Sequence, residues 1–187
     1  MVLLAEAYQK ASVMRTGEYL TTINEMTDQI PALRPQLLWH AAHELIKVGE
    51  WSGNKILTEE DKGVALSTAV SLIRGLPLAI ARWYPYHLPT EVNVPIACEY
   101  YKGNLYVNGI EPGDRVIIVD DTISTGGTLL SLINAVRQRG AEIAEILVLV
   151  EKAENQGVEF IKRKTGVDVK TVLKIKVEES GVTVLGN

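Results

Sequence analysis

The chain has 187 residues, a net charge of −4 at pH 7, 47% hydrophobic residues and 22% charged residues. This balance is typical of one globular domain, and the negative charge argues against a general attraction to nucleic acid or to anionic membranes. The single cysteine, Cys98, excludes an intrachain disulfide and favours a reducing, cytoplasmic setting. Because the sequence contains no long apolar run, we expect neither a signal peptide nor a membrane-spanning segment.

Hydrophobic periodicity predicts helices and strands that alternate along the chain. In order, it predicts a helix over 2–11, a strand over 18–24, a helix over 35–48, a strand over 55–58, a helix over 63–74 and a strand over 76–81. A long aromatic segment is followed by a strand over 116–119, a helix over 125–139, a strand over 144–150, a helix over 158–164 and strands over 169–177 and 182–185. Pro35 suits the first turn of its helix, and Gly75 and Gly140 stand where helices end.

The aromatic segment, residues 82–108, interrupts this pattern. It contains three prolines, five tyrosines and one tryptophan. We interpret it as a long loop and as a candidate lid, because long loops in compact domains usually carry function. Its aromatic content argues against disorder.

Strands that alternate with helices imply a parallel sheet with helices on both faces. Ligands bind such sheets beyond the carboxyl ends of the strands. Three segments follow a predicted strand at that edge, namely "LTEEDKG" at 57–63, "AIARWYP" at 79–85 and "VDDTISTGGT" at 119–128.

The third segment joins an acidic pair to a glycine-rich turn that opens a helix. Unpaired backbone N–H groups in such a turn, together with the helix dipole, form an anion site, and glycines allow a phosphate to approach closely. Ionised Asp120 and Asp121 can only accept hydrogen bonds, which suits a pair of sugar hydroxyls. The stretch therefore fits a ribose 5-phosphate. The alternative is that the acids cap a turn and the glycines only redirect the chain.

The longer stretch "VIIVDDTISTGGT" at 116–128 resembles the motif with which type I phosphoribosyltransferases bind 5-phosphoribosyl-1-pyrophosphate (PRPP). The resemblance extends over nearly the whole chain and is strongest to archaeal purine enzymes, of the adenine type and of the hypoxanthine-guanine type. It implies an α/β fold, a central parallel sheet flanked by helices, as a single domain over 1–187. It also implies a small hood made from 1–34 and 151–187 and a flexible lid over 83–108.

The same resemblance implies roles for the residues of the motif. Asp120 and Asp121 would bind the ribose hydroxyls. The 5′-phosphate would be bound by the turn that follows, through Ser124, Thr125, Gly126, Gly127 and Thr128.

The other two strand ends acquire candidate roles as well. Asp61, Lys62 and Gly63 stand where the family binds pyrophosphate, and Arg82 is expected to reach the same group. Taken alone, the segment 58–63 has the composition of an ordinary charged surface turn. The family often places further basic residues after the arginine, whereas Trp83 follows it here, which weakens the case for a strong phosphate clamp.

Recognition of the base depends on two further features of the resemblance. The 6-oxopurine enzymes typically carry a third acid where this chain has Ser124, and adenine enzymes usually have a small residue there. Adenine enzymes also have a glutamate–tyrosine pair in the lid, which Glu99 and Tyr100 match, although Tyr101 replaces a glycine. The match implies general acid/base catalysis by Glu99 and lid closure by Tyr100, with Arg82 completing the catalytic set. The alternative is a tyrosine-rich hairpin at a subunit interface.

We therefore expect a cytoplasmic, homodimeric purine-salvage enzyme that converts adenine and PRPP to AMP and pyrophosphate. The resemblance implies Mg²⁺ as cofactor, carried by PRPP, with Asp120 or Asp121 as candidates for a contact through water. Hypoxanthine or guanine is the alternative base, because some archaeal enzymes that use them also lack the third acid. A PRPP-sensing transcription regulator is a further alternative, which the acidic chain and the short segment before the first strand disfavour.

Overall fold

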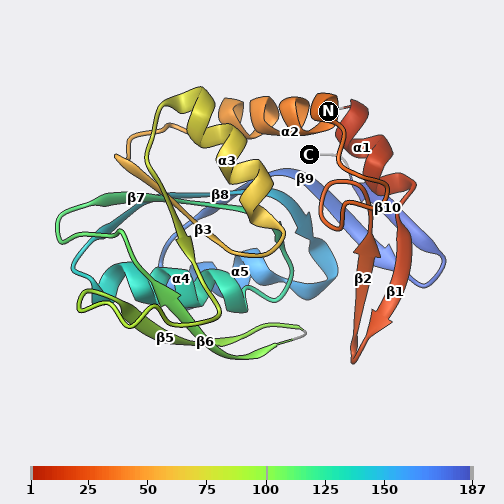
Figure 1. Ribbon diagram of the computed structural model, residues 1–187. Coiled ribbons are helices and arrows are strands. Elements are labelled where there is room, and N and C mark those ends of the chain that lie inside the picture. Colours follow the sequence, from red (N-terminus) through yellow and green to blue (C-terminus); the bar gives the residue numbers. More distant parts are fainter. Residues whose placement is uncertain (1, 100, 186–187) are drawn as a thin grey trace.

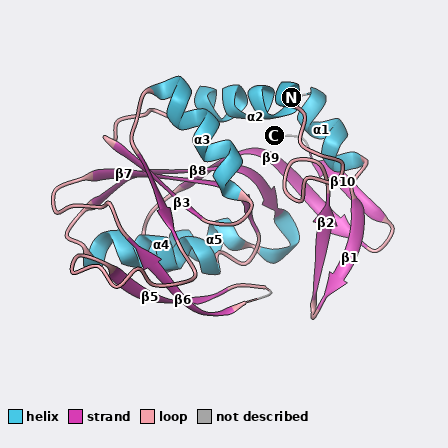
Figure 2. Ribbon diagram, in the orientation of Figure 1, coloured by secondary structure: helices cyan, strands magenta, loops and turns pink. Residues whose placement is uncertain are grey.

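A six-stranded sheet forms the centre of the structure, and helices cover both of its faces (Figures 1 and 2). The computed structural model describes residues 2–99 and 101–185. The helices are α1 (Val2–Gln9), α2 (Pro35–Val48), α3 (Gly63–Arg74), α4 (Gly127–Gln138) and α5 (Gly157–Thr165), with a 3₁₀ turn, η1 (Ala153–Asn155), before α5. The strands are β1 (Ser12–Thr16), β2 (Tyr19–Ile23), β3 (Lys55–Glu59), β4 (Leu78–Ala81), β5 (Val92–Ala97), β6 (Lys102–Val107), β7 (Arg115–Ile123), β8 (Glu142–Lys152), β9 (Val169–Glu178) and β10 (Gly181–Leu185).

The order of strands in the central sheet is β10-β9-β8-β7-β3-β4, and only the β10–β9 pair is antiparallel. The carboxyl ends of the five parallel strands therefore meet at one edge, where ligands bind in folds of this kind. This arrangement confirms the expected fold class. The segment 151–187, which we expected in the hood, contributes β9 and β10 to the sheet itself.

The two faces of the sheet are buried in separate hydrophobic cores. Along β7, Val116 and Ile118 belong to the core formed with α4, α5 and the β5–β6 hairpin, whereas Ile117 and Val119 belong to the core formed with α1, α2 and α3. All four side chains are fully buried, which explains why this strand is a continuous apolar run in the sequence. Each contributes roughly 1.5–3 kcal/mol to folding, so the strand is a firm support for the acids at its end.

Residues 82–108 are not a loop throughout, because β5 and β6 form an antiparallel hairpin that packs on α4 (Figure 1). Along β5, Val92, Val94 and Ile96 are buried and the residues between them are more exposed. This two-residue period predicts a strand, but three prolines in the segment obscured it. Pro95 is compatible with β5 because proline is tolerated at a sheet edge. The Ser131 hydroxyl donates to the Pro95 carbonyl at 2.8 Å and fixes the hairpin to α4.

A second hairpin, β1–β2, stands beside β10 at the other end of the molecule (Figure 1). The first of its strands was not predicted, because no residue of it is buried and the apolar pattern is weak. Both β7 and β8 extend past their predicted ends, since their pairing continues through the polar residues that follow the apolar runs. None of the helices in the described part of the chain is long and apolar enough to cross a membrane.

Candidate active site

The last four residues of β7 include two adjacent acids, which lie at the carboxyl edge of the sheet. The side chains of Asp120 and Asp121 are each about 95% buried, and the backbone N–H of Asp121 donates to Oδ1 of Asp120 at 3.0 Å. Burial raises the pKa of both carboxyls, and for Asp120 the neighbouring charges of Asp121 and Glu59 raise the pKa further. Oδ2 of Asp121 is buried without a hydrogen-bond partner in the structure. Such an atom is suited to accept a hydrogen bond from a ligand.

A tight turn connects these acids to α4. Gly126 has a φ of +85°, a conformation that glycine adopts without strain, and no side chain caps the helix that begins at Gly127. The first backbone N–H groups of α4 are therefore available for an anion, and the helix dipole favours negative charge there. Thr125 and Thr128 line the same cavity and add hydroxyl donors.

Gly127 is in close contact with the β5–β6 hairpin, and replacing it by alanine tests that contact. A Cβ at this position would lie 1.8 Å from the backbone carbonyl oxygen of Ala97, at the end of β5. We expect Gly127→Ala to displace the hairpin and to destabilise the protein by about 1–3 kcal/mol, measured by urea unfolding. Gly113→Ala is the control, because a Cβ there meets no atom within 4 Å, although its φ of +87° adds strain. Since the strain in Gly113→Ala can by itself destabilise by about 1–3 kcal/mol, the contact is judged from amide exchange in β5. Unchanged exchange there in Gly127→Ala would contradict the contact.

One cavity gathers most of the residues predicted from the sequence. Its lining includes Lys62, Glu99, Asp120, Asp121 and the turn 124–128. Three other predicted residues, Asp61, Gly63 and Arg82, do not line it, and Tyr100 lies outside the described residues. The lining also includes residues for which no individual role was predicted: Thr21, Thr22, Thr27, Glu59, Cys98 and Lys152.

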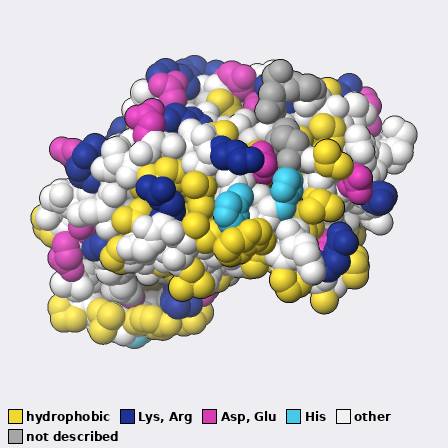
Figure 3. Space-filling view, turned by 90° about the horizontal axis from the view of Figure 1, so that it is seen from above, with side chains coloured by type: hydrophobic (Ala, Val, Ile, Leu, Met, Phe, Trp, Pro, Cys, Tyr) yellow, Lys and Arg dark blue, Asp and Glu magenta, His cyan; other side chains and the backbone are white. Residues whose placement is uncertain are grey.

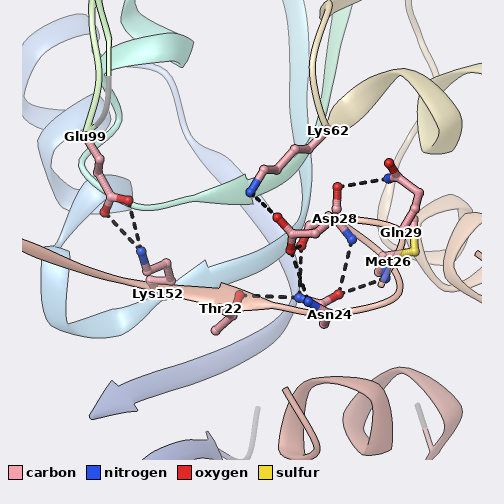
Figure 4. A network of polar contacts seen from close by, with 9 residues as sticks. Thr22, Asn24, Met26, Asp28, Gln29, Lys62, Glu99 and Lys152 are labelled. Carbon is pink, nitrogen blue, oxygen red and sulfur yellow. Dashed lines mark hydrogen bonds and ion pairs between the residues drawn. The ribbon is translucent and has the colours of Figure 1, made fainter. Parts of the chain in front are cut away.

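Lys62 stands at the N-terminus of α3, at the end of the cavity nearest the N-terminal segment (Figure 4). Its Nζ lies 2.7 Å from Oδ1 of Asp28, and the other carboxylate oxygen of Asp28 accepts from the Asn24 backbone N–H at 3.1 Å and the Thr27 hydroxyl at 2.5 Å. Although burial lowers it, the pKa of Lys62 is raised overall, mainly by Asp28. Lys62 is therefore charged and is held by an acid of the loop between β2 and α2.

The other two residues of the predicted pyrophosphate loop have different positions. Asp61 is exposed. Gly63 packs behind the acids, and a Cβ there would lie 2.8 Å from Oδ1 of Asp120. Arg82 directly follows β4, and its guanidinium donates to Glu60 at 2.9 Å and lies over the ring of Tyr86. The structure thus places Arg82 beside the cavity but not in its lining.

A second polar cluster lies at the opposite end of the cavity (Figure 4). Nζ of Lys152, at the end of β8, lies 3.0 and 3.1 Å from the two carboxylate oxygens of Glu99. Glu99 also accepts hydrogen bonds from the Ser124 hydroxyl and, at 3.3 Å, from the Asn155 amide. The side chains of Lys152 and Glu99 are only 4% and 7% exposed. Glu99, in the turn after β5, thus contacts both Ser124 of the β7–α4 turn and the buried cation of Lys152.

Lys152 could have been found in the sequence. The run "ILVLVEK" at 146–152 is a buried strand followed by charged residues, as at the other three strand ends. Because parallel strands end at the same edge, the end of β8 was a fourth candidate for the site.

Glu59, the last residue of β3, is a further buried acid beside Asp120 and Asp121. Burial raises its pKa to about 8, and the charges of Asp61, Asp121 and Glu60 act in the same direction, while the hydrogen bond from the Trp83 indole opposes them. Its carboxyl group is therefore protonated in the folded protein at neutral pH and ionised in the unfolded chain.

This raised pKa predicts a pH dependence of stability. Between pH 4.5 and 8 the folded protein holds a proton on Glu59 that the unfolded chain has lost, so stability falls as the pH rises through this range. We expect Glu59→Gln to make the free energy of unfolding less dependent on pH and to stabilise the protein by a few kcal/mol at pH 8. Urea unfolding at pH 5, 6.5 and 8 measures the effect. The prediction fails if the difference between the two proteins is the same at all three values.

Asp120 and Asp121 are better suited to a Mg²⁺ that is bound chiefly by a ligand than to a metal ion held by the protein alone. Across 2–99 and 101–185, no group of three or more His, Cys, Asp or Glu side chains is placed to hold a metal. Carboxylates are nonetheless ligands that Mg²⁺ prefers, and Asp121 offers an unpartnered oxygen. The residues therefore fit an ion bound chiefly by a diphosphate, with one carboxylate in contact directly or through water.

Comparison with known proteins agrees with this geometry. The model of the phosphoribosyl transferase domain matches residues 38–184. The chain belongs to the phosphoribosyltransferase family. It is 42% identical to a protein of Methanocaldococcus vulcanius named hypoxanthine/guanine phosphoribosyltransferase, over 98% of this chain and 100% of that protein. A protein of the same name from Methanocaldococcus jannaschii is 40% identical over the same shares.

Solved structures of adenine phosphoribosyltransferases share the fold of this chain. The enzyme from Rhodothermus marinus superposes with a TM-score of 0.74 at 26% identity, covering 92% of this chain and 98% of that chain. The enzyme from Giardia lamblia, complexed with 9-deazaadenine, superposes with a TM-score of 0.75 at 21% identity, covering 91% and 97%. At 21% identity, the likeness to the Giardia lamblia enzyme shows the fold alone.

Proposed function

We propose that the protein transfers the 5-phosphoribosyl group of PRPP to a purine base, and that the base is a 6-oxopurine, hypoxanthine or guanine. The observation that carries this choice is the position of Lys152. Its ammonium lies in the cavity lining beside Ser124 and the lid. An ammonium donates hydrogen bonds and accepts none, so it suits the carbonyl oxygen of a 6-oxopurine and not the amino group of adenine.

The phosphoribosyl group would be held by the end of β7 and the turn after it. Asp121, with its unpartnered oxygen, and Asp120 would accept hydrogen bonds from the ribose hydroxyls. The uncapped start of α4 would bind the 5′-phosphate through backbone N–H groups and threonine hydroxyls. Lys62, at the start of α3, would bind pyrophosphate once Asp28 releases it, and Arg82 would assist from the rim.

In the reaction, a ring nitrogen of the base forms a bond to C1 of the ribose, and the bond from C1 to the pyrophosphate oxygen breaks. Mg²⁺ bound to the diphosphate would stabilise the negative charge of the leaving group. Glu99 would accept the proton that the base loses, because its carboxylate lies beside Ser124, at the end of the phosphoribosyl site. The Glu99 carboxylate would thus take the place of the third acid of the motif, where this chain has Ser124. Closure of the hairpin would also exclude water from C1.

Adenine, the base that we expect from the sequence, is the second candidate. Ser124 is a small residue, and Glu99 could accept a hydrogen bond from the adenine amino group as readily as from a ring N–H. The relatives named for hypoxanthine and guanine are closer in sequence than the adenine enzymes of known structure, which supports the first choice.

Turnover assays decide between the two bases. Purified protein with PRPP and Mg²⁺ is supplied with hypoxanthine, guanine or adenine, and the release of pyrophosphate is measured. We expect kcat/KM for hypoxanthine or guanine to exceed that for adenine by about 100-fold or more, the discrimination typical of a site with a misplaced polar group. Preferred turnover of adenine would overturn the choice of base, and no turnover of any purine would overturn the function. Light scattering of the same sample tests the homodimer that we propose from the family.

A further inference from the structure

Two residues that depart from the family pattern lie against each other in the structure. Trp83 follows Arg82 where basic residues are common, and Tyr101 replaces a glycine of the lid. Their rings are stacked, with centroids 4.4 Å apart and an interplanar angle of 17°. Aromatic contacts of this geometry are attractive beyond the area that they bury. Neither residue has a role in the function proposed above.

Trp83 is anchored to the end of β3. Its indole N–H donates to the carboxyl group of Glu59, and its backbone N–H donates to Oε1 of Glu60 at 2.8 Å. Glu59 is about 95% buried at the central sheet, so the indole has a fixed position at the carboxyl edge.

Tyr101 belongs to the tip of the lid hairpin. Its backbone carbonyl accepts from the Cys98 N–H at 2.9 Å and so closes the turn that contains Glu99. Its ring lies over Gly103, where a Cβ would come within 2.1 Å of the tyrosine hydroxyl. Only glycine at 103 leaves room for the ring in this position, in which it meets Trp83.

We propose that Glu59, Trp83 and Tyr101 form a latch that holds the lid tip against the carboxyl edge and thereby positions Glu99 beside Lys152 and Ser124. The three are positioning residues, since they act on the reaction through Glu99. The inference rests on the proposed function only for what Glu99 does to the base. The position of the lid tip does not depend on the proposed function.

Amide hydrogen exchange of the ligand-free protein tests the latch without substrate. We expect Trp83→Leu and Tyr101→Ser each to speed exchange in 98–107 by about 2- to 10-fold, the range for loss of one aromatic pair. The double variant should exchange no faster than the faster single variant, because both changes remove the same contact. Tyr101→Phe keeps the ring and should leave exchange unchanged, whereas Trp83→Phe should have an intermediate effect, since it keeps a ring and loses the bond to Glu59.

Trp39→Leu is the matched control. This indole is 61% exposed on α2, on the face of the sheet opposite the hairpin, and its loss should not alter exchange in 98–107. Wild-type exchange in both Trp83→Leu and Tyr101→Ser would overturn the latch. If Trp83→Leu does not fold, Tyr101→Ser decides alone, because the tyrosine is only partly buried at the hairpin tip.

Kinetics separates the latch from a general contribution to stability. With the preferred base, Trp83→Leu should lower kcat/KM for the base by about the factor seen in exchange, while the dissociation constant for PRPP stays the same. Tyr101→Phe should keep wild-type values for both. An equal loss of affinity for PRPP would overturn the positioning role. A protein that turns over no purine, yet shows the expected exchange, would overturn the proposed function and leave the latch supported.

Discussion

Replacing Asp120 and Asp121 together by asparagine is expected to abolish PRPP binding and leave the fold intact. Both side chains are buried at the end of β7, and the unpartnered oxygen of Asp121 belongs to the cavity. Hydrogen bonds to charged groups contribute about 1.5–3 kcal/mol each, so the loss of two should weaken binding by about 100-fold or more. Calorimetric titration with PRPP and Mg²⁺ measures this loss.

The same variant should not be less stable than the wild type above neutral pH. Burial raises the pKa of both acids, so the folded state disfavours their ionised form and loses stability as the pH rises through the folded values. Asparagine removes that effect. Asp168→Asn is the control, because this aspartate is exposed and forms a surface ion pair with Lys162. Unchanged PRPP affinity in the double variant would remove the central assignment of the site.

Replacing Lys152 by methionine is expected to remove turnover of the 6-oxopurine while PRPP binding persists. Methionine keeps the length of the side chain and loses the donor for the carbonyl oxygen. We expect kcat/KM for hypoxanthine and guanine to fall by about 10- to 150-fold, as for one lost hydrogen bond to a charged group. The variant should also lose about 3–5 kcal/mol of stability, because it leaves Glu99 buried without its cation.

The second substitution Glu99→Gln tests the cause of the lost stability. Added to Lys152→Met, it should restore much of the stability, because no buried charge is then left unpaired. Turnover is compared in Lys152→Met alone, since Glu99 is itself the proposed proton acceptor. Lys174→Met is the matched control, because Lys174 also pairs with a buried glutamate, Glu151, at 3.2 Å, and does not line the cavity. Wild-type turnover of hypoxanthine and guanine by Lys152→Met would exclude Lys152 from base recognition.

The parts of the site that were predictable are those that are contiguous in sequence. The acids and the glycine turn lie within nine residues, 120–128, so the local order of strand, turn and helix was enough to assign them. The pairing of Glu99 with Lys152 was not predictable, because it joins a lid and a strand end that only the tertiary fold brings together. The same is true of Lys62 and Asp28, whose contact depends on how the loop after β2 folds over α3.

Two errors in the fold have different causes. The β5–β6 hairpin lies where we expect a long loop, because the three prolines of 82–108 hide the alternation of buried and exposed residues along β5. The first strand of the β1–β2 hairpin was missed because it buries no side chain, so that periodicity gives no signal. Tyr100 lies outside the described residues, so its predicted role in lid closure stays a prediction. The neighbouring Tyr101, which departs from the family pattern, contacts Trp83.

The separation of the two hydrophobic cores bears on how base preference can change in evolution. Figure 3 views the molecule from the side of α2 and α3, and the lid hairpin belongs to the core beneath the opposite face of the sheet. Substitutions that reshape the lid therefore need no compensation around α1, α2 or α3, because distant sites without shared partners act independently. The start of α4, which we propose binds the sugar phosphate, lies in the same core as the hairpin and closely approaches it where Gly127 meets Ala97. A change of base on the hairpin side is therefore constrained by that contact and not by the packing of α1, α2 and α3.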